Sequence, residues 1–186
     1  MFMSTGPGSH RTDAPSPWIV RFASLIPKAG AVLDLACGFG RHSRYLASLG
    51  FRVEAVDRDA EAIVTLAGVS GVAARVADIE RGPWPFAGRY FDAVVVTNYL
   101  WRPLFPIILD ALDRAGVLMY ETFAVGNERF GKPSNPDFLL QPGELLAVVC
   151  GRLKVIAFED LYVEEPKPAM VQRICAVGLG HRGAAS

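Results

Sequence analysis

The chain has 186 residues, a length that suits one domain with a full hydrophobic core. Hydrophobic residues make up 51% of it, which excludes a chain that is disordered throughout. Its 19 Lys and Arg residues balance its 19 Asp and Glu residues, so the formal net charge is zero. Proteins that bind duplex nucleic acid usually carry a basic excess or a basic stripe, and the sequence has neither. We therefore expect no nucleic-acid partner.

The cysteines and the hydropathy pattern indicate the compartment. Cys37, Cys150 and Cys175 are far apart and lack C-x-x-C spacing, which argues against a disulfide framework or a structural zinc site. Reduced thiols are typical of a cytoplasmic protein, and no residue spacing suggests a metal site. No apolar run approaches the roughly 18 residues that a membrane span needs, so we expect no membrane partner. The sequence leaves the oligomeric state open.

Periodicity and turn signals divide the chain into one domain and two tails. Residues 1–16 are rich in Gly, Ser, Pro and Thr and lack an apolar signal core, so we expect a flexible tail there. The domain spans residues 17–180, and residues 181–186 form a C-terminal tail. Helical spacing, short apolar runs and Gly or Pro breakers predict the elements of the domain. These are helices at 17–26, 41–49, 59–67, 103–112 and 142–149, and strands at 31–36, 51–56, 72–77, 91–97, 116–123, 153–163 and 169–179.

The order of these elements predicts an α/β fold. Strands that alternate with helices indicate βαβ units and a mostly parallel, doubly wound sheet. The last two strands are joined by a short charged link at 164–168, which predicts a hairpin, so one of them must run antiparallel to the rest. In such an open sheet, a ligand binds at the carboxyl ends of the strands near the switch point.

A glycine turn between the first strand and its helix is the most informative segment. Residues 34–40 read DLACGFG and fit the pattern D-x-A/G-x-G-x-G. We expect Gly38 and Gly40 to let a ligand lie against the backbone, at a helix N-terminus that attracts an anionic group. The dinucleotide pattern G-x-G-x-x-G fits poorly, because Ser43 replaces its third glycine. The carboxylate of Asp34 would repel a pyrophosphate but attract the amino group and sulfonium of S-adenosylmethionine (SAM).

Acidic residues also follow the second and third strands. Asp57 ends the second strand, where a carboxylate can accept hydrogen bonds from both hydroxyls of a ribose. Asp78 follows the third strand and can accept from an adenine amine, while Ile79 packs on the ring. The alternatives are that Asp57 only caps a turn and that Asp78 is a solvated turn residue.

Together these residues carry a resemblance to a known family. The order of Asp34, the glycine turn, Asp57, Asp78 and the apolar run FDAVVV at 91–96 resembles the class I SAM-dependent methyltransferases over about residues 32–179. The resemblance implies a Rossmann-like sheet of seven strands in the order 3-2-1-4-5-7-6, with strand 7 antiparallel. It implies SAM as cofactor, with the methionine part near the glycine turn, the ribose near Asp57 and the adenine near Asp78. The residues expected to bind it are Asp34, Ala36, Cys37, Gly38, Gly40, Asp57, Arg58, Asp78, Ile79 and Asn98.

The segments after the fourth and fifth strands are expected to hold the methyl acceptor. Asn98 and Tyr99 follow the fourth strand, at the position that faces the sulfonium in the family, and we take both as candidate catalytic residues. The prolines of the Asn-Pro-Pro-Tyr motif of nucleic-acid and protein methylases are missing, so we expect a small-molecule acceptor. Tyr99 and Trp101 are also candidates for the acceptor wall, with core packing as the alternative for both. Glu121 is a candidate base at the end of the fifth strand, or a plain surface acid.

The loop at 124–141 is long, polar and rich in glycine, which is typical of a lid. Phe123, Arg129 and Phe130 could hold a flat or anionic acceptor there. The segments YETF at 120–123 and LLQPGEL at 139–145 are similar to small bacterial methyltransferases related to tellurite-resistance enzymes. Two other functions remain open at this point. One is a SAM-binding sensor or partner subunit without catalysis, and the other is a nicotinamide-dependent oxidoreductase.

Overall fold

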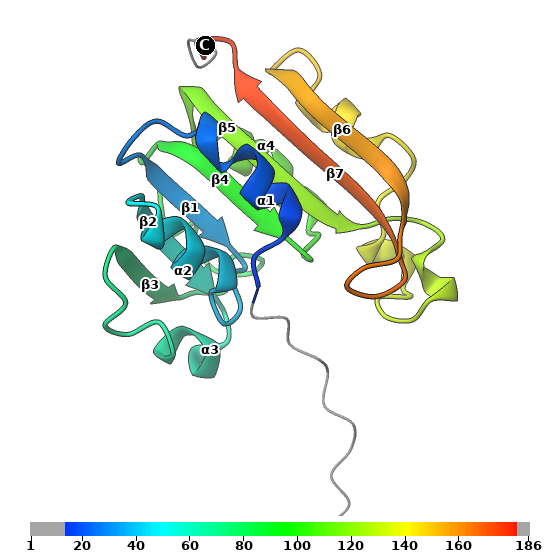
Figure 1. Cartoon of the computed structure of the whole chain (residues 1–186), viewed down its shortest axis with the longest axis horizontal. Coiled ribbons are helices and arrows are strands. Elements are labelled where there is room, and N and C mark those ends of the chain that lie inside the picture. The colour runs from blue at the N-terminus through cyan, green and yellow to red at the C-terminus, as the bar shows by residue number, and fades with distance from the viewer. Residues whose placement is uncertain (1–13, 182–186) are drawn as a thin grey trace, which may run out of the picture.

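One seven-stranded sheet runs through the computed structural model, which describes residues 14–181 (Figure 1). The strands lie in the order β3-β2-β1-β4-β5-β7-β6, as the sequence predicts. They are β1 (Ala31–Leu35), β2 (Arg52–Asp57), β3 (Val72–Val76), β4 (Phe91–Thr97), β5 (Leu112–Phe123), β6 (Leu153–Val163) and β7 (Ala169–Gly178). The helices are α1 (Pro17–Phe22), α2 (Arg41–Ser48), α3 (Ala60–Val64), α4 (Phe105–Asp110) and α5 (Glu144–Val149), with 3-10 turns η1 (Ala23–Leu25), η2 (Arg102–Leu104), η3 (Asn127–Arg129) and η4 (Pro136–Phe138).

The pairing of the strands confirms the predicted strand directions, which are mostly parallel with one antiparallel strand near the C-terminus. β1 to β5 pair in parallel, whereas β7 runs antiparallel to both β5 and β6. The five parallel strands therefore deliver their carboxyl ends to the same edge of the sheet. The turns that follow these strands lie there side by side, although they are far apart in the sequence (Figure 1).

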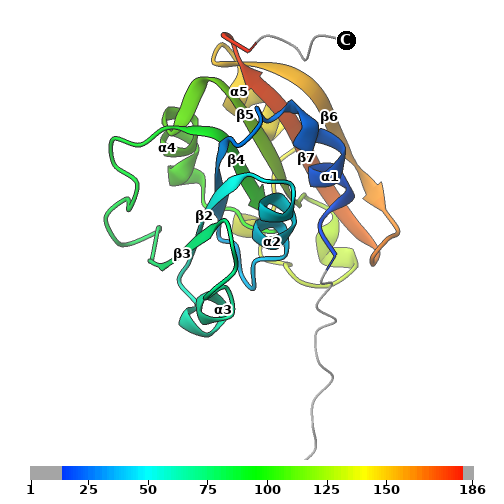
Figure 2. The same cartoon turned by 60° about the vertical axis from the view of Figure 1, so that its left-hand side comes forward.

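Helices cover both faces of the sheet and bury its apolar side chains. On one face α1 and α2 pack, with Trp18, Ile19 and Leu46 in the core (Figure 1). On the other face lie α4 and α5, with Ile108 and Leu145 (Figure 2). The central strand β4 is buried on both sides, which explains its continuous apolar run.

Most predicted element boundaries hold, and two do not. Asp59 caps α3 by accepting from the backbone N–H groups of the first turn, and Pro106 lies in the first turn of α4, as predicted. β5 begins at Leu112, four residues before its predicted start at Gly116. The helix predicted to begin at Pro142 begins two residues later. Gly143 follows with a φ of 69°, which breaks the helical path, so α5 starts only at Glu144.

The structure describes only part of the two predicted tails. Residues 1–13 and 182–186 lie outside the described residues. Ser16, which the sequence places in the tail, is 4% exposed and caps α1 through its side chain. His181 contacts the backbone of Leu25. Within residues 14–181, no helix is both long and apolar enough to cross a membrane.

Candidate functional site

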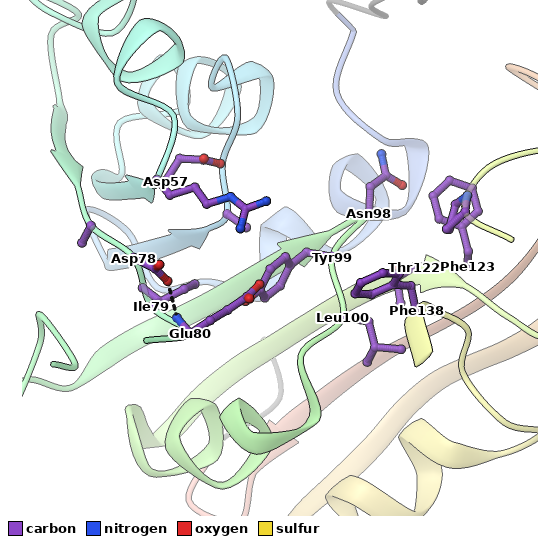
Figure 3. Close-up of a pocket in the computed structure, with 14 residues that line it drawn as sticks. Asp57, Asp78, Ile79, Glu80, Asn98, Tyr99, Leu100, Thr122, Phe123 and Phe138 are labelled. Carbon is purple, nitrogen blue, oxygen red and sulfur yellow. Dashed lines mark hydrogen bonds between the residues drawn. The ribbon is translucent and has the colours of Figure 1, made fainter. Parts of the chain in front are cut away.

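A cavity of about 430 Å³ opens at the carboxyl ends of the parallel strands. Figure 3 shows that Asp57, Asp78 and Ile79 lie at one end of it and Thr122, Phe123 and Phe138 at the other. The side chains that line it come from the turns after β1, β2, β3 and β4, from the end of β5, and from the loop at 124–141. They are Ala36, Asp57, Arg58, Ala77, Asp78, Ile79, Glu80, Asn98, Tyr99, Leu100, Thr122, Phe123, Pro133 and Phe138.

The turn after β1 is built from left-handed residues. Ala36, Gly38 and Gly40 have φ angles of 52°, 53° and 72°. A Cβ on Gly38 would meet no heavy atom within 4 Å, so the backbone there faces open space, as predicted. A Cβ on Gly40 would lie 2.4 Å from Leu66 Cδ2. Gly40 therefore leaves room for the side chain of Leu66, in the segment after α3.

Asp34 lies beneath this turn and does not line the cavity. It is 1% exposed, and its Oδ2 accepts a hydrogen bond from Ser43 Oγ at 2.5 Å. Its Oδ1 is buried and has no hydrogen-bond partner within the described residues. Burial raises the pKa of this carboxyl from 3.8 to about 6. The carboxylate thus lies under the start of α2, where its charge is poorly solvated.

Cys37 is also turned away from the cavity. Its side chain is buried with Ala55, Ile63 and Leu66 between β2 and α3. Burial and the nearby carboxylates raise the pKa of its thiol, so it stays protonated. Across residues 14–181, no cluster of three or more His, Cys, Asp or Glu side chains could hold a metal ion.

Asp57 joins the turn after β1 to the turn after β2. Its Oδ2 accepts from the backbone N–H of Gly38 at 2.8 Å, and its Oδ1 accepts from that of Asp59 at 2.9 Å. A carboxylate has about four acceptor sites, so both oxygens can accept further hydrogen bonds. Arg58 lines the cavity beside it. Asp57 is therefore both a clamp on the glycine turn and an acceptor at the cavity wall.

The turn after β3 contributes Asp78, Ile79 and Glu80. Asp78 Oδ1 accepts from the backbone N–H groups of Glu80 and Arg81, so it also caps its own turn. Tyr99 reaches across from the end of β4 and donates to Glu80 Oε1 at 3.2 Å (Figure 3). Burial and the charge of Glu80 raise the pKa of Tyr99, so its phenol remains neutral.

Asn98 lies between the two ends of the cavity. It has a φ of 55°, and its backbone N–H donates to the carbonyl of Glu121 at 2.9 Å. Ala36, after the neighbouring strand, adopts the same uncommon conformation. Non-glycine residues with positive φ cost energy and cluster at functional sites. Three non-glycine residues among residues 14–181 have positive φ. Ala36 and Asn98 line this cavity, whereas Ala29 does not, and the pair supports the choice of this edge of the sheet as the site.

Glu121 points to the opposite face of the sheet from the neighbouring Thr122. Its Oε1 accepts from Ser16 Oγ at 2.8 Å, and its Oε2 pairs with Arg173 at 3.1 Å. His42 lies close by: its Nε2 accepts from the backbone N–H of Ser16, and its Nδ1 lies 3.2 Å from Thr97 Oγ1. Glu121 does not line the cavity, so the structure does not bring it to the other candidate catalytic residues.

The protonation of His42 follows from these contacts. A backbone N–H can only donate, so Nε2 is unprotonated and Nδ1 carries the proton toward Thr97. Burial lowers the pKa of His42 from 6.5 to about 3. His42 is therefore a neutral side chain that fastens the start of α1 to the end of β4.

The acceptor residues predicted from the sequence separate into two groups. Tyr99 and Phe123 line the cavity. Trp101 packs against the core on the α4 and α5 side, which is the alternative left open for it. Phe130 packs on Tyr162 of β6 with ring centroids 5.2 Å apart, and Arg129 lies over the Phe130 ring. The last three side chains do not line the cavity.

The loop at 124–141 instead presents Pro133 and Phe138, which sequence reasoning missed. Arg102 holds this part of the loop. Its guanidinium binds both carboxylate oxygens of Glu144 and donates to the carbonyls of Asp137 and Leu139, on either side of Phe138. These distances are 2.7–2.9 Å, the range of charge-assisted hydrogen bonds. No local sequence signal distinguishes Phe138 from Phe130.

The other missed residues lie next to predicted ones. Glu80 comes two residues after Asp78, and Leu100 follows Tyr99 directly. Thr122 could have been found from the alternation of side chains along β5, since it shares a face with the buried Tyr120. Ala77, at the end of β3, is the last of them.

Comparison with known proteins shows which proteins the chain resembles. Residues 32–115 match the sequences described as a methyltransferase domain. No curated protein matches the chain. Among solved structures, TehB from Haemophilus influenzae superposes with a TM-score of 0.77 at 19% identity, over 91% of this chain and 64% of TehB. A TehB-like SAM-dependent methyltransferase from Corynebacterium glutamicum gives 0.61 at 20% identity, over 84% of this chain and 86% of the other. The N-methyltransferase NodS from Bradyrhizobium japonicum gives 0.67 at 16% identity, over 86% and 92%.

These solved structures, all of which share less than 25% identity with this chain, show the fold. The fold is a Rossmann-like α/β sheet with an antiparallel strand β7, and its cavity lies at the strand ends where the conserved order of such sheets places a ligand. The match to a methyltransferase domain covers residues 32–115, and the fold resembles that of TehB and of the TehB-like SAM-dependent methyltransferase. The chain spans 64% of the length of TehB.

Proposed function

We propose that the chain transfers the methyl group of SAM to a small molecule bound against Thr122, Phe123 and Phe138. The observation that carries this proposal is the chemical difference between the two ends of the cavity. One end holds carboxylates after β2 and β3, and the other is lined by apolar and aromatic side chains. A volume of about 430 Å³ is in the usual range for small-molecule sites.

The first end of the cavity fits the adenosine part of SAM. Asp57 keeps acceptor capacity on both oxygens and can bind the ribose hydroxyls. Asp78 uses only Oδ1 among the described residues, which leaves Oδ2 for the adenine amine. Ile79 provides an apolar surface for the ring, and Arg58 closes the wall.

The glycine turn fits the methionine part. The open space in front of Gly38 lets a ligand approach the backbone, and Ala36 already lines the cavity. When bound, SAM supplies an electrophilic methyl group on a sulfonium. Asn98, at the junction of the two ends, is placed to face that group, and Tyr99 forms the adjoining wall.

The chain's own contribution to catalysis is alignment and exclusion of water. Holding two reactants in the reactive geometry can supply several kcal/mol of the barrier reduction. Glu121 is bound to Ser16 and Arg173 on the other face of the sheet, so we do not assign it the role of a base. Asn98 and Tyr99 remain the candidates for direct contact with the reacting groups.

A small acceptor agrees with the shape of the site. The loop at 124–141 adds Pro133 and Phe138 to the acceptor end, and this enclosing position of the loop favours a small acceptor. The three free cysteines, two of them buried, support a location in the cytoplasm.

Calorimetry tests this function directly. We expect the protein to bind SAM and S-adenosylhomocysteine (SAH) but not NADH. Asp57→Ala should weaken SAM binding by about 1.5–3 kcal/mol, as expected for lost hydrogen bonds to a charged acceptor. The matched control is Asp59→Ala, which removes the neighbouring acid and the cap of α3 but no cavity residue. NADH binding without SAM binding, or equal SAM affinity in Asp57→Ala and the parent, would contradict the proposal.

A further inference from the structure

The backbone of Asn98, beside the cavity in Figure 3, is fixed from two sides. Its φ of 55° is uncommon for a residue with a side chain, and such a conformation persists where neighbouring contacts over-determine it. Its N–H donates to the carbonyl of Glu121, which lies opposite Thr97 in the register of β4 and β5. Thr97 and Glu121 thus bracket Asn98, one along the chain and the other across the sheet. The contacts of these two residues therefore control the direction of the Asn98 side chain.

Ser16 is connected to both of the residues that bracket Asn98. Its Oγ donates to Glu121 Oε1 at 2.8 Å. Its backbone N–H donates to His42 Nε2 at 3.1 Å, and the protonated Nδ1 of His42 lies 3.2 Å from Thr97 Oγ1. Two paths of hydrogen bonds therefore start at Ser16 and end on either side of Asn98. Neither Ser16 nor His42 lines the cavity, so their effect on a ligand has to pass through these neighbours.

The residues at the start of these paths are themselves held in place. Ser16 is 4% exposed and His42 is 1% exposed. Ser16 Oγ also accepts from the backbone N–H of Trp18 at 3.1 Å, and the Trp18 ring nitrogen donates to a carbonyl of β7 at 3.2 Å. Arg173 binds the second carboxylate oxygen of Glu121 at 3.1 Å. Side chains that are locked by packing and hydrogen bonds can fix the geometry of a neighbouring site.

Packing alone does not account for polar side chains at this point. α1 already packs on the sheet through Trp18, Ile19 and Phe22. Burying a hydroxyl, an imidazole and a carboxylate is costly unless each is hydrogen-bonded, and apolar side chains of similar size often serve stability as well. A buried polar network adds direction, because its hydrogen bonds hold both distance and angle. Here that direction is set at the strand ends next to the cavity.

We propose that Ser16 and His42 are positioning residues for methyl transfer, because together they hold Asn98 in the conformation that turns its side chain toward the reacting methyl group of SAM. This inference rests on the proposed function, which takes Asn98 to face that group. Neither positioning residue touches the cofactor or the acceptor. Their loss frees the backbone of Asn98 and leaves the proposed cofactor contacts of Asp57 and Asp78 in place.

Amide hydrogen exchange at Asn98, followed by NMR, tests the positioning directly. Thr97→Val removes the hydroxyl that His42 contacts and keeps the shape of the side chain. We expect the Asn98 amide to exchange about fivefold faster, as for one lost hydrogen bond, with recovery in Thr97→Ser. Ser16→Ala removes the contact to Glu121 and should act in the same direction, with recovery in Ser16→Thr. Unchanged exchange in both Thr97→Val and Ser16→Ala would overturn the proposal.

A matched control at the other end of β4 separates positioning from a general loss of stability. Asp92 Oδ2 accepts from the backbone N–H of Ala31 at 2.7 Å, so Asp92→Ala also removes one hydrogen bond of this strand. In Asp92→Ala the Asn98 amide should speed up no more than the amides of residues 93–96. In Thr97→Val it should speed up more than they do. An equal change throughout β4 in Thr97→Val would show a purely structural contact, and the proposal would be wrong.

Binding of SAM distinguishes this inference from the proposed function. Calorimetry should give SAM affinities for Thr97→Val and Ser16→Ala within about twofold of the parent, because the changed side chains do not line the cavity. The side-chain amide resonance of Asn98 should shift when SAM saturates the parent, and shift less in both variants. Equal shifts in all three proteins would contradict the positioning role while the proposed function stands. If the parent does not bind SAM, the proposed function fails, and faster exchange in the variants would still show the hold on Asn98.

Discussion

The two ends of the cavity are built in different ways. Ala36, Asp57 and Asp78, which we propose contact the cofactor, each lie within two residues of the end of a parallel strand. At the acceptor end, Pro133 and Phe138 lie ten or more residues beyond β5, in a loop that returns to the sheet. The sheet itself fixes the first set, whereas contacts made far away in the sequence fix the second.

These distant contacts decide which side chains of the loop reach the cavity. Arg102 binds the carbonyls on either side of Phe138. Phe130, eight residues earlier, packs instead on Tyr162 in the hairpin of β6 and β7. The difference teaches that a residue next to a strand end can be placed from sequence, while one in a long loop cannot. Four predictions follow this division, in order of decreasing effect.

Gly38→Val should have the largest effect. A side chain with positive φ costs about 1–2 kcal/mol, and here it would also fill the space in front of the turn. We expect SAM binding to weaken by about 3 kcal/mol or more, roughly 150-fold. The control is Gly50→Val, which has a φ of 88° and open space at the end of α2, away from the cavity. If both variants bind SAM like the parent, the glycine turn is not at the cofactor.

Asp34→Asn should stabilise the protein near neutral pH. The folded-state pKa of about 6 lies above the value of 3.8 for the free side chain. The folded protein thus holds a proton that the unfolded chain has lost, so the free energy of unfolding falls as pH rises from about 4 to 6. Two pKa units correspond to about 3 kcal/mol at pH 7. Asparagine cannot ionise, so the variant avoids this loss.

Urea unfolding at pH 4 and pH 7 measures this effect, with the exposed Asp113→Asn as control. The stabilities of Asp34→Asn and the parent should converge at pH 4 and differ most at pH 7. Equal stability at both values would show that burial does not disfavour the charge of Asp34. If SAM affinity also falls tenfold or more, the Asp34 carboxylate acts on the cofactor through the glycine turn and belongs to the cofactor site.

Arg102→Met should loosen the acceptor end alone. Losing the partly exposed contacts to Glu144 and to the loop carbonyls should lower the free energy of unfolding by about 1 kcal/mol. The KM for the acceptor should rise several-fold because Phe138 is no longer held, with SAM affinity within twofold of the parent. Arg152→Met is the control, since Arg152 pairs with Asp110 at the surface. An equal loss of SAM affinity would mean that the two ends are not independent.

The paired change of Arg129→Ala and Phe130→Ala should have the smallest effect. Both side chains lie outside the cavity, so SAM affinity and acceptor turnover should stay within twofold of the parent. Calorimetry with SAM and steady-state kinetics with an accepted small molecule measure the two quantities. A large loss of turnover would return these residues to the acceptor wall, as the sequence first suggested, and would point to a second position of the loop.

The sequence determined the fold and several of the residues that line the cavity at the strand ends. Apolar runs alternating with helical periodicity can form only a parallel doubly wound sheet with short turns, and the charged link at 164–168 forces the final hairpin. Residues such as Asp57, Asp78 and Asn98 followed from this, because parallel strands deliver their carboxyl ends to one edge. The glycine turn was recognisable because its conformation depends on residue types close in the chain.

Only the tertiary structure decided which way individual side chains face. Asp34 is turned under α2 by Ser43, and Gly40 makes room for Leu66, although both belong to the motif read from the sequence. Glu121 and Thr122 are neighbours, yet the pleat of β5 sends one to Arg173 and the other to the cavity. In the loop, Phe138 lines the cavity and Phe130 does not, because Arg102 holds the backbone beside Phe138 and Tyr162 packs on Phe130. Packing and hydrogen bonds between residues distant in the sequence set these side-chain orientations, so a local sequence pattern cannot predict them.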